Sequence, residues 1–282
     1  MLLLKSADDV ASQLKKIRKS GSLTGFVPTM GALHEGHISL LKNSKQICGI
    51  SICSIFVNPT QFNNPDDFKK YPVTLEHDIY MLEKNGCDIL FVPGINEIYP
   101  EGKISKKHFD LGNLESILEG EFRPGHFQGV CQVVNRLLEI VYPTHLFIGQ
   151  KDYQQSMVIK KLLELEHLNI ELIICPTLRE ENGLAMSSRN MRLSKQQKEQ
   201  AAEIYKTLIN IKNKIKPGSL NHLKEEAKDY LSKKNFNPDY VEIAYANNLK
   251  SVNEWDGSSD LIALAAAFVN EVRLIDNVLI KV

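Results

Sequence analysis

An alternation of strand-like and helix-like segments runs through the first two thirds of the chain and constrains its fold most strongly. Short β-branched apolar runs alternate with longer stretches of helical periodicity. The predicted strands are 23–27, 50–57, 88–92, 145–148 and 170–175, and the predicted helices include 74–84, 129–141 and 154–166. Strands that alternate with helices are typical of a parallel sheet covered by helices, so we predict an α/β domain.

The pattern changes after Pro176. Two charged, helix-favouring segments, 194–214 and 219–234, are followed by strand candidates at 240–244, 261–266 and 272–275. Helices followed by strands favour a small α+β domain over further βαβ units. We therefore predict two domains, 1–176 and 177–282, with the boundary between Pro176 and Asn190.

Composition narrows the class of partner. The 282 residues carry 34 Lys and Arg against 34 Asp and Glu, so the formal net charge is zero. This balance argues against a broad nucleic-acid or membrane-binding surface. The apolar start, Met1–Leu4, is too short for a signal-peptide core, and no apolar run approaches the roughly 18 residues of a membrane span. The five cysteines form no C-x-x-C pair, which favours buried thiols in a reducing cytoplasm.

The segment 28–37, Pro-Thr-Met-Gly-Ala-Leu-His-Glu-Gly-His, joins a predicted strand to an amphipathic run at 38–42. Unpaired N–H groups and a partial positive charge make the start of a helix suitable for a phosphate. The spacing of His34 and His37 places both imidazoles near one face of the first turn. The segment therefore indicates nucleotide chemistry.

Polar clusters follow four of the predicted strands, at 28–37, 58–62, 149–155 and 178–190. Parallel sheets collect ligands at the carboxyl ends of their strands, so these clusters together predict one site. Each has an ordinary interpretation when taken alone. The histidine pair could be a surface or capping feature, the Lys151–Asp152 pair a solvated ion pair, and Ser187–Ser188 a helix cap. The two histidines lie three apart, which is not the spacing of an H-E-x-x-H zinc motif.

Five motifs together resemble the pantothenate synthetase (pantoate–β-alanine ligase) family. They are the segment 28–37, Phe-Val-Asn-Pro-Thr-Gln-Phe at 56–62, Arg-Pro-Gly-His-Phe at 123–127, Gly-Gln-Lys-Asp-Tyr-Gln-Gln at 149–155 and Leu-Ala-Met-Ser-Ser-Arg-Asn at 184–190. The resemblance runs in order over essentially the whole chain. The histidine motif alone would indicate only the wider nucleotidyltransferase superfamily, which includes class I aminoacyl-tRNA synthetases.

The resemblance implies a Rossmann-like N-terminal domain, a smaller C-terminal domain that closes over it, and a homodimer. It implies ATP and Mg²⁺ as requirements, (R)-pantoate and β-alanine as substrates, and neither nucleic acid nor membrane as a partner. The implied reaction has two steps: the pantoate carboxylate attacks the α-phosphate of ATP, and the amine of β-alanine then attacks the resulting pantoyl adenylate.

The resemblance also implies roles for individual residues. His37 would be the proton donor, with His34 and Lys151 as the other catalytic groups. The nucleotide would contact Met30, Gly31, Ala32, Leu33, His34, Glu35, Gly36, His37, Gly149, Gln150, Lys151, Asp152, Leu178, Met186, Ser187, Ser188 and Arg189. Gln61 and Gln155 would bind pantoate, and Gln61 would also contact β-alanine. No metal ligands are assigned.

Two positions depart from the family pattern. Gln150 is neutral where a charged residue is frequent, and Ala244–Tyr245 replaces a Val-Asp pair. Two alternatives stay open from the sequence: a nucleotidyltransferase that transfers AMP to another acceptor, and a silent nucleotide-binding protein. The second would be expected to have lost His37, Lys151 or the Ser-Ser-Arg run, and this sequence retains all three.

Overall fold

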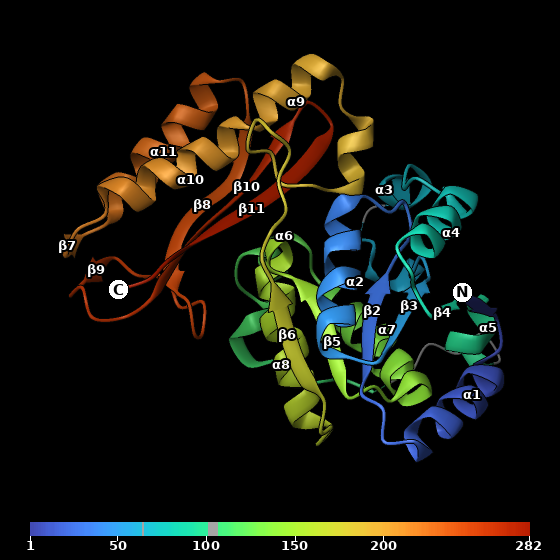
Figure 1. Cartoon of the computed structure of the whole chain (residues 1–282). Helices are drawn as coiled ribbons and strands as arrows, with labels where there is room; N and C mark the ends of the chain where they lie inside the picture. The colour runs from blue at the N-terminus through green and yellow to red at the C-terminus, as the bar shows by residue number, and fades with distance from the viewer. Residues whose placement is uncertain (64, 101–106) are drawn as a thin grey trace. The chain divides into compact units, whose positions relative to one another are not determined.

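The computed structural model describes residues 1–63, 65–100 and 107–282. The chain divides into two compact units, drawn in Figure 1. The first comprises Met1–Gly149 and Gln155–Pro176, and the second comprises Gln150–Gln154 and Thr177–Val282. The short turn that follows the fifth strand thus groups with the C-terminal residues.

Within the described residues, the first unit contains a six-stranded sheet in the order β1-β4-β3-β2-β5-β6, and its pairings are parallel. The strands are β1 (Leu2–Leu4), β2 (Thr24–Thr29), β3 (Ile50–Ile55), β4 (Ile89–Phe91), β5 (His145–Gly149) and β6 (Glu171–Cys175). The predicted α/β class with a parallel sheet is confirmed. Strands β3 and β4 are added in order on one side of β2, and the next strand, β5, pairs with β2 on its other side. This reversal is the point at which such sheets bind ligands.

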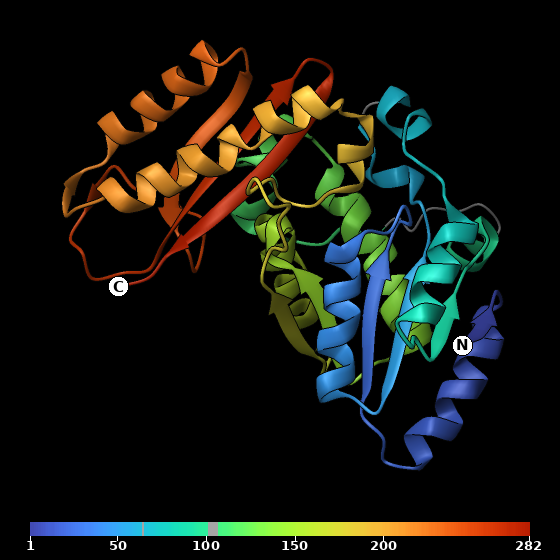
Figure 2. The ribbon, with the colours of Figure 1, turned by 45° about the horizontal axis from the view of Figure 1, so that its top comes forward.

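Helices cover both faces of this sheet because its strands are apolar on both sides. Phe26 and Ile52 belong to one core cluster, while their chain neighbours Val27 and Cys53 belong to another on the opposite face. In Figure 2, α2 lies over one face and α7 over the other. The helices are α1 (Ala7–Lys19), α2 (Glu35–Ile47), α3 (Pro65–Lys69), α4 (Leu75–Lys84), α5 (Ile95–Ile98), α6 (Glu119–Phe122), α7 (His126–Val141) and α8 (Tyr153–Leu165), with the 3₁₀ turns η1 (Pro59–Gln61) and η3 (Gly112–Glu115). The 3₁₀ turn η4 (Gln150–Asp152), which precedes α8, belongs to the second unit.

The second unit contains an antiparallel sheet in the order β11-β10-β8, against which α10 and α11 pack. The fully buried Ala263 and Ala265 of β10 let the apolar sides of the helices approach closely. Its elements are η5 (Ser188–Arg192), α9 (Lys195–Ala201), α10 (Glu203–Lys214), α11 (Asn221–Lys233), β8 (Asn237–Tyr245), β10 (Leu261–Val269) and β11 (Val272–Ile280), with a small ribbon of β7 (Gly218–Ser219) and β9 (Glu254–Trp255).

Several element boundaries differ from the prediction. The helix expected at 194–214 is two helices that meet at Ala202, and the last strand continues to Ile280. The helix α1 was not predicted, although Ser6 caps it by accepting a bond from the Asp9 N–H at 3.4 Å. Strand β1 was also missed, because three residues are too few for a period-2 pattern.

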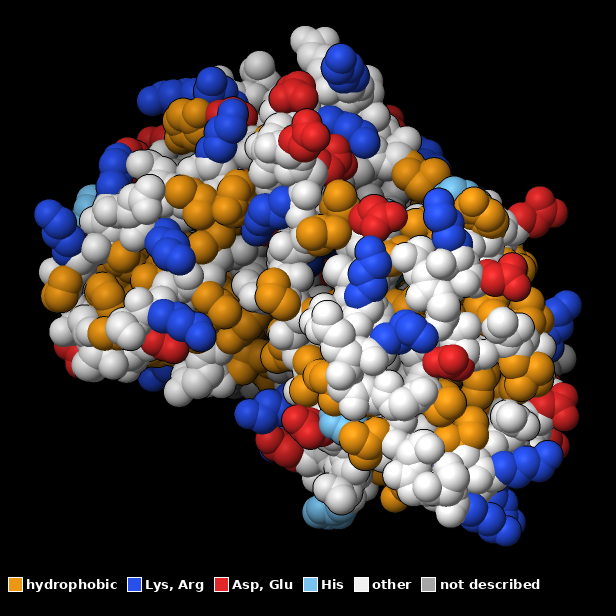
Figure 3. Space-filling view, viewed as in Figure 1, with side chains coloured by type: hydrophobic (Ala, Val, Ile, Leu, Met, Phe, Trp, Pro, Cys, Tyr) orange, Lys and Arg blue, Asp and Glu red, His pale blue; other side chains and the backbone are white. Residues whose placement is uncertain are grey.

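On the face of the molecule in Figure 3, Lys and Arg side chains are interspersed with Asp and Glu side chains among hydrophobic and other groups. This mixture is the spatial counterpart of the zero formal net charge. Among the described residues, every helix is too short or too polar to cross a membrane.

Candidate functional site

A buried carboxylate holds the loop that leaves β2. Gly31 and Ala32 have φ values of +81° and +48°, which turn the chain sharply before α2. Asp78 of α4 accepts the N–H of Ala32 at 2.9 Å through Oδ2 and the N–H of Leu33 at 2.8 Å through Oδ1. Its Oδ1 also accepts the Thr74 hydroxyl at 3.0 Å. Three bonds to a carboxylate that is 1% exposed hold the loop in this conformation.

His34 and His37 occupy the first turn of α2, as their spacing predicted. His34 is the N-cap, and its Nδ1 accepts the N–H of Gly36 at 3.2 Å. The Nδ1 of His37 accepts the N–H of His34 at 3.3 Å, and the ring centroids are 4.0 Å apart. Because a backbone N–H can only donate, these bonds assign the proton of each neutral ring to Nε2. Both rings therefore carry an Nε2–H donor at a helix start.

Gln61 lies at the end of η1, directly after β3. The residue is 9% exposed, and its Nε2 lies 2.7 Å from Met30 Sδ. Its backbone carbonyl accepts from Nδ1 of His126 at 2.8 Å. The Asn58 amide lies 3.4 Å from Gln61 Oε1 and accepts the Tyr99 hydroxyl at 2.7 Å. Burial raises the pKa of Tyr99, which keeps that hydroxyl protonated as a donor.

The Arg-Pro-Gly-His-Phe motif forms the support beneath Gln61. Arg123 Nη1 donates to Nε2 of His126 at 3.1 Å, which leaves the proton of a neutral ring on the Nδ1 that faces Gln61. One turn further along α7, a Cβ on Gly129 would lie 2.5 Å from the carbonyl oxygen of Thr60. Glycine at 129 thus lets η1 lie directly on the helix.

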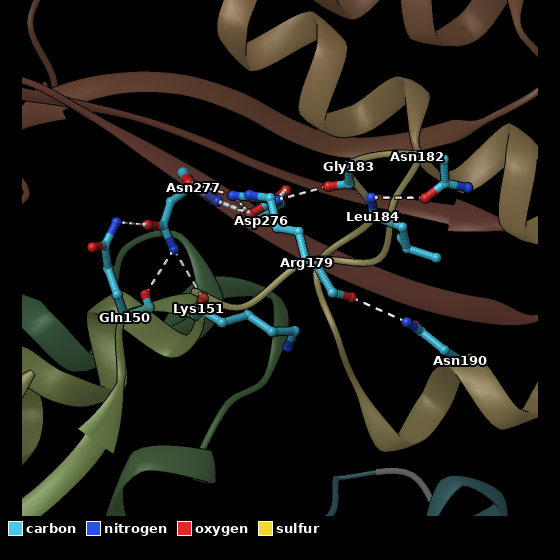
Figure 4. Close-up of polar contacts among 10 residues, drawn as sticks. Gln150, Lys151, Arg179, Asn182, Gly183, Leu184, Asn190, Asp276 and Asn277 are labelled. Carbon is cyan, nitrogen blue, oxygen red and sulfur yellow. Dashed lines mark hydrogen bonds and ion pairs between the residues drawn. The ribbon is translucent and has the colours of Figure 1, made fainter. Parts of the chain in front are cut away.

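Lys151 lies in η4, in the second unit. Its Nζ is 3.6 Å from Asp152 Oδ1, and its side chain is 17% exposed. Asn277 of β11 donates through Nδ2 to the carbonyl oxygens of Gln150 and Lys151, each at 2.9 Å. Figure 4 shows these bonds and the lysine side chain extending away from Asn277.

A hairpin in the second unit brings Leu178 and Met186 together, since the Met186 N–H donates to the Leu178 carbonyl at 3.0 Å. Between them, Arg179 forms a bidentate ion pair with Asp276 of β11: its Nη1 donates to Oδ2 at 2.6 Å and its Nη2 to Oδ1 at 3.0 Å. The guanidinium carbon lies 3.7 Å from the centroid of the Tyr205 ring. Burial raises the pKa of Asp276, and the Arg179 guanidinium opposes that rise.

The Ser-Ser-Arg run follows this hairpin and begins η5. Ser187 caps it by accepting the Arg189 N–H at 3.3 Å, so the capping interpretation of this serine is correct. Ser188 is buried. The Asn190 amide donates to Glu180 Oε1 at 3.1 Å and to the Ala185 carbonyl at 3.0 Å, which ties η5 back to the hairpin.

The expected site residues thus form one group in each unit. The first unit holds Met30, Gly31, Ala32, Leu33, His34, Glu35, Gly36, His37, Gln61, Gly149 and Gln155, and the second holds Gln150, Lys151, Asp152, Leu178, Met186, Ser187, Ser188 and Arg189. Gly149 ends β5, and Gln155 is half-buried in the first turn of α8. Within the described part of the chain, no cluster of three or more His, Cys, Asp or Glu side chains could hold a metal ion.

Three supporting side chains were missed by the sequence analysis: Asp78, His126 and Asn277. His126 lies in the Arg-Pro-Gly-His-Phe motif, whose sequence does not indicate the part of the chain that the histidine contacts. Asp78 and Asn277 carry no local signal, because each acts on residues far away in the sequence.

Comparisons with known proteins give the family of this chain. The family model for pantoate–β-alanine ligase matches residues 2–279. The pantothenate synthetase of Cytophaga hutchinsonii is 45% identical over 283 residues, covering 99% of each chain. A crystal structure of pantothenate synthetase from Thermus thermophilus is 35% identical, with a TM-score of 0.88 over 99% of each chain. The Francisella tularensis ligase, described as complexed with β-γ ATP and β-alanine, is 38% identical, with a TM-score of 0.84 over 99% of this chain and 97% of that one. This chain belongs to the pantoate–β-alanine ligase family.

Proposed function

We propose that this chain condenses (R)-pantoate with β-alanine at the expense of ATP, yielding pantothenate, AMP and pyrophosphate through a pantoyl-adenylate intermediate. The pair of Nε2–H donors on His34 and His37 is the observation that carries the proposal. These donors lie at a helix start beside the strand where the sheet order reverses, which suits them to the phosphates of a nucleotide.

The first step activates a poor acyl donor. A carboxylate oxygen of pantoate attacks the α-phosphorus of ATP, and the bond from that phosphorus to the bridging oxygen breaks as pyrophosphate leaves. Two anions must approach each other, so positioning and charge neutralisation dominate the catalysis. His37 acts as proton donor from its imidazolium form, passing the Nε2 proton to the departing oxygen and returning to the neutral ring described above, and His34 donates a hydrogen bond from Nε2 to the phosphates.

Lys151 and the Ser-Ser-Arg run supply the remaining contacts to the phosphates in this proposal. Lysine neutralises the charge of the phosphoryl group during transfer as a compact cation. Ser187, Ser188 and Arg189 bind the β- and γ-phosphates, and the planar arginine donates several bonds at once. Backbone and side-chain groups at Gly149–Asp152, Leu178 and Met186 contact the rest of the nucleotide.

The second step forms the amide. The amine of β-alanine attacks the acyl carbon, the acyl–phosphate bond breaks, AMP leaves and the nitrogen loses a proton. Gln61 and Gln155 hold pantoate by its hydroxyl and carboxylate groups, and such amides reject analogues that lack those groups. The support of Gln61 by Asn58 and His126 is consistent with this role.

We also propose that Mg²⁺ arrives bound to ATP, because magnesium in such sites is held largely by substrate phosphates. Residues 1–176 would bind ATP and pantoate, and residues 177–282 would act as a lid and contribute to a homodimer. The five free, buried cysteines are consistent with the reducing cytoplasm that we propose as its location.

A coupled assay for AMP with each substrate omitted in turn tests the proposal. We expect sustained AMP formation only when pantoate, β-alanine and Mg-ATP are all present. Steady pyrophosphate release from pantoate and ATP without any amine, beyond one equivalent per enzyme, would instead indicate an AMP transferase. No AMP formation from the complete mixture would refute the ligase.

A further inference from the structure

We propose that Asn277, on β11, is a positioning residue that sets the direction of the Lys151 side chain. This inference rests on the proposed role of Lys151 at the phosphates. Both residues belong to the second unit, although they are 126 positions apart in the sequence. Figure 4 shows the amide of Asn277 against the η4 turn that carries the lysine.

Asn277 is a buried residue, 2% exposed, and its side-chain amide is bonded through both its nitrogen and its oxygen. Its Nδ2 donates to the carbonyl oxygens of Gln150 and Lys151, and its Oδ1 accepts from Gln150 Nε2 at 3.2 Å. Because carbonyl oxygens can only accept, the NH₂ group must be the end that faces the turn. An aspartate at 277 would place an acceptor there instead.

These two bonds constrain the lysine more than a single contact would. The carbonyl of Gln150 belongs to the peptide plane before Lys151 Cα, and the carbonyl of Lys151 belongs to the plane after it. Holding both carbonyls fixes the two planes that meet at that Cα, and therefore its φ and ψ. The direction of the Cα–Cβ bond follows from them, so Asn277 determines where the lysine side chain begins.

Asn277 is itself held by its neighbour on β11. Its backbone N–H donates to Asp276 Oδ1 at 2.8 Å, and the same carboxylate binds Arg179 of the hairpin. Arg179 also donates to the Gly183 carbonyl at 3.1 Å. Two consecutive residues of β11 thus hold both the lysine turn and the hairpin that leads to Ser187–Arg189. This strand therefore fixes the position of the turn that carries Lys151 relative to the hairpin that precedes Ser187–Arg189, within the second unit.

The test compares Asn277→Asp with Asn277→Ala. The aspartate has nearly the same volume but turns a carboxylate oxygen toward the two carbonyl oxygens, whereas alanine only removes the bonds. We expect Asn277→Asp to slow single-turnover adenylation by about 10²-fold and Asn277→Ala by about tenfold, since small misplacements of a catalytic group have effects of this size. The KM for pantoate should change by less than about threefold, because uniform substrate binding is not altered.

A matched control is Asp239→Asn, which removes the charge from a second ion pair of the same sheet: Asp239 Oδ2 accepts from Arg273 Nε at 2.7 Å, both side chains are half-buried, and the Asp239 carboxylate is not bonded to η4. It should lower unfolding stability and leave the adenylation rate near that of wild type. If Asp239→Asn slows adenylation as much as the Asn277 variants do, Asn277 acts only on general stability and the proposal fails.

A double-mutant cycle identifies the route of the effect. If Asn277 acts through Lys151, adding Asn277→Asp to Lys151→Ala should cost less than about threefold more, measured at enzyme concentrations that quantify the slower rate. The same factor in both backgrounds would overturn the proposal.

Hydrogen exchange in the ligand-free protein separates this inference from the proposed function. Amides of the 150–154 segment should exchange at least about threefold faster in Asn277→Asp than in wild type, whatever the enzyme's substrates prove to be. Unchanged exchange would refute the positioning claim. Absence of AMP formation by wild type would instead refute the proposed function.

Discussion

Replacing Asp78 by asparagine tests whether its buried carboxylate holds the loop 30–34, which joins β2 to α2, in its active conformation. The carboxylate accepts three bonds, two of them from the backbone N–H groups of Ala32 and Leu33. Asparagine retains one oxygen. Placed at the Oδ1 position, that oxygen keeps the bonds from Leu33 and Thr74, while the NH₂ group meets the N–H of Ala32.

The loss can be estimated from these bonds. One bond to a charged group is worth about 1.5 to 3 kcal/mol, and the remaining two weaken by roughly half when the charge is removed. The neutral amide is cheaper to bury, which offsets part of the loss. We therefore expect Asp78→Asn to lower the free energy of unfolding by about 2 to 4 kcal/mol. Because the loop leads to the N-cap His34, adenylation should slow by about 10²-fold.

Urea unfolding followed by circular dichroism, together with single-turnover pyrophosphate release, measures both effects. A suitable control is Asp88→Asn: Asp88 Oδ2 accepts the N–H and the hydroxyl of Ser51, at 2.8 and 2.7 Å, near the amino ends of β3 and β4. The control should lose less stability, because Asp88 is more exposed, and should keep its adenylation rate. If Asp78→Asn keeps wild-type stability and an adenylation rate within threefold of wild type, Asp78 does not hold the loop in the way proposed. Equal slowing in both variants would show that the effect is not specific to the loop.

Substitutions at His37, Gln61, Gly129 and Cys131 test the proposed contribution of each residue. His37→Ala should slow adenylate formation by about 10²-fold or more with an unchanged circular dichroism spectrum, and near-normal turnover would exclude His37 as the proton donor. Gln61→Ala should weaken the use of pantoate with little change in ATP affinity; a loss of ATP binding alone would contradict the assignment. Gly129→Ala should raise the KM for pantoate more than that for ATP, since the new Cβ would lie 2.5 Å from the Thr60 carbonyl oxygen and push η1 away, and equal kinetic constants would show that η1 tolerates the methyl group. Burial raises the pKa of the Cys131 thiol from 9.0 to about 12, so its contribution to the free energy of unfolding is complete below pH 9 and declines as the pH rises toward 12, by at most about 1.4 kcal/mol per pH unit. Urea unfolding from pH 8 to 11 should therefore show a shallower decline in the free energy of unfolding for Cys131→Ala than for wild type. Parallel declines in the two proteins would contradict this.

Much of the first unit could be read from the sequence because its signals are local. Strand β3 begins at Ile50 and α4 ends at Lys84, where apolar periodicity placed them. The pairing of His34 with His37 was also predictable, since residues three apart on a helix start lie close together. The split at Ala202 was not, because Ala201, Ala202 and Glu203 all favour a helix and no Gly or Pro marks the break.

Periodicity and residue type are local properties, and they were enough to predict the α/β class, the order of the strand-end loops and the chemical groups that these loops carry. How those groups are held depends on the packing of elements that are distant in the sequence. The supporting bonds join Ala32 to Asp78, Gln61 to His126 and Lys151 to Asn277, across 46, 65 and 126 positions. Such bonds leave no periodic trace along the chain, because they form only after strands and helices distant in sequence have packed together and excluded water from the polar groups between them.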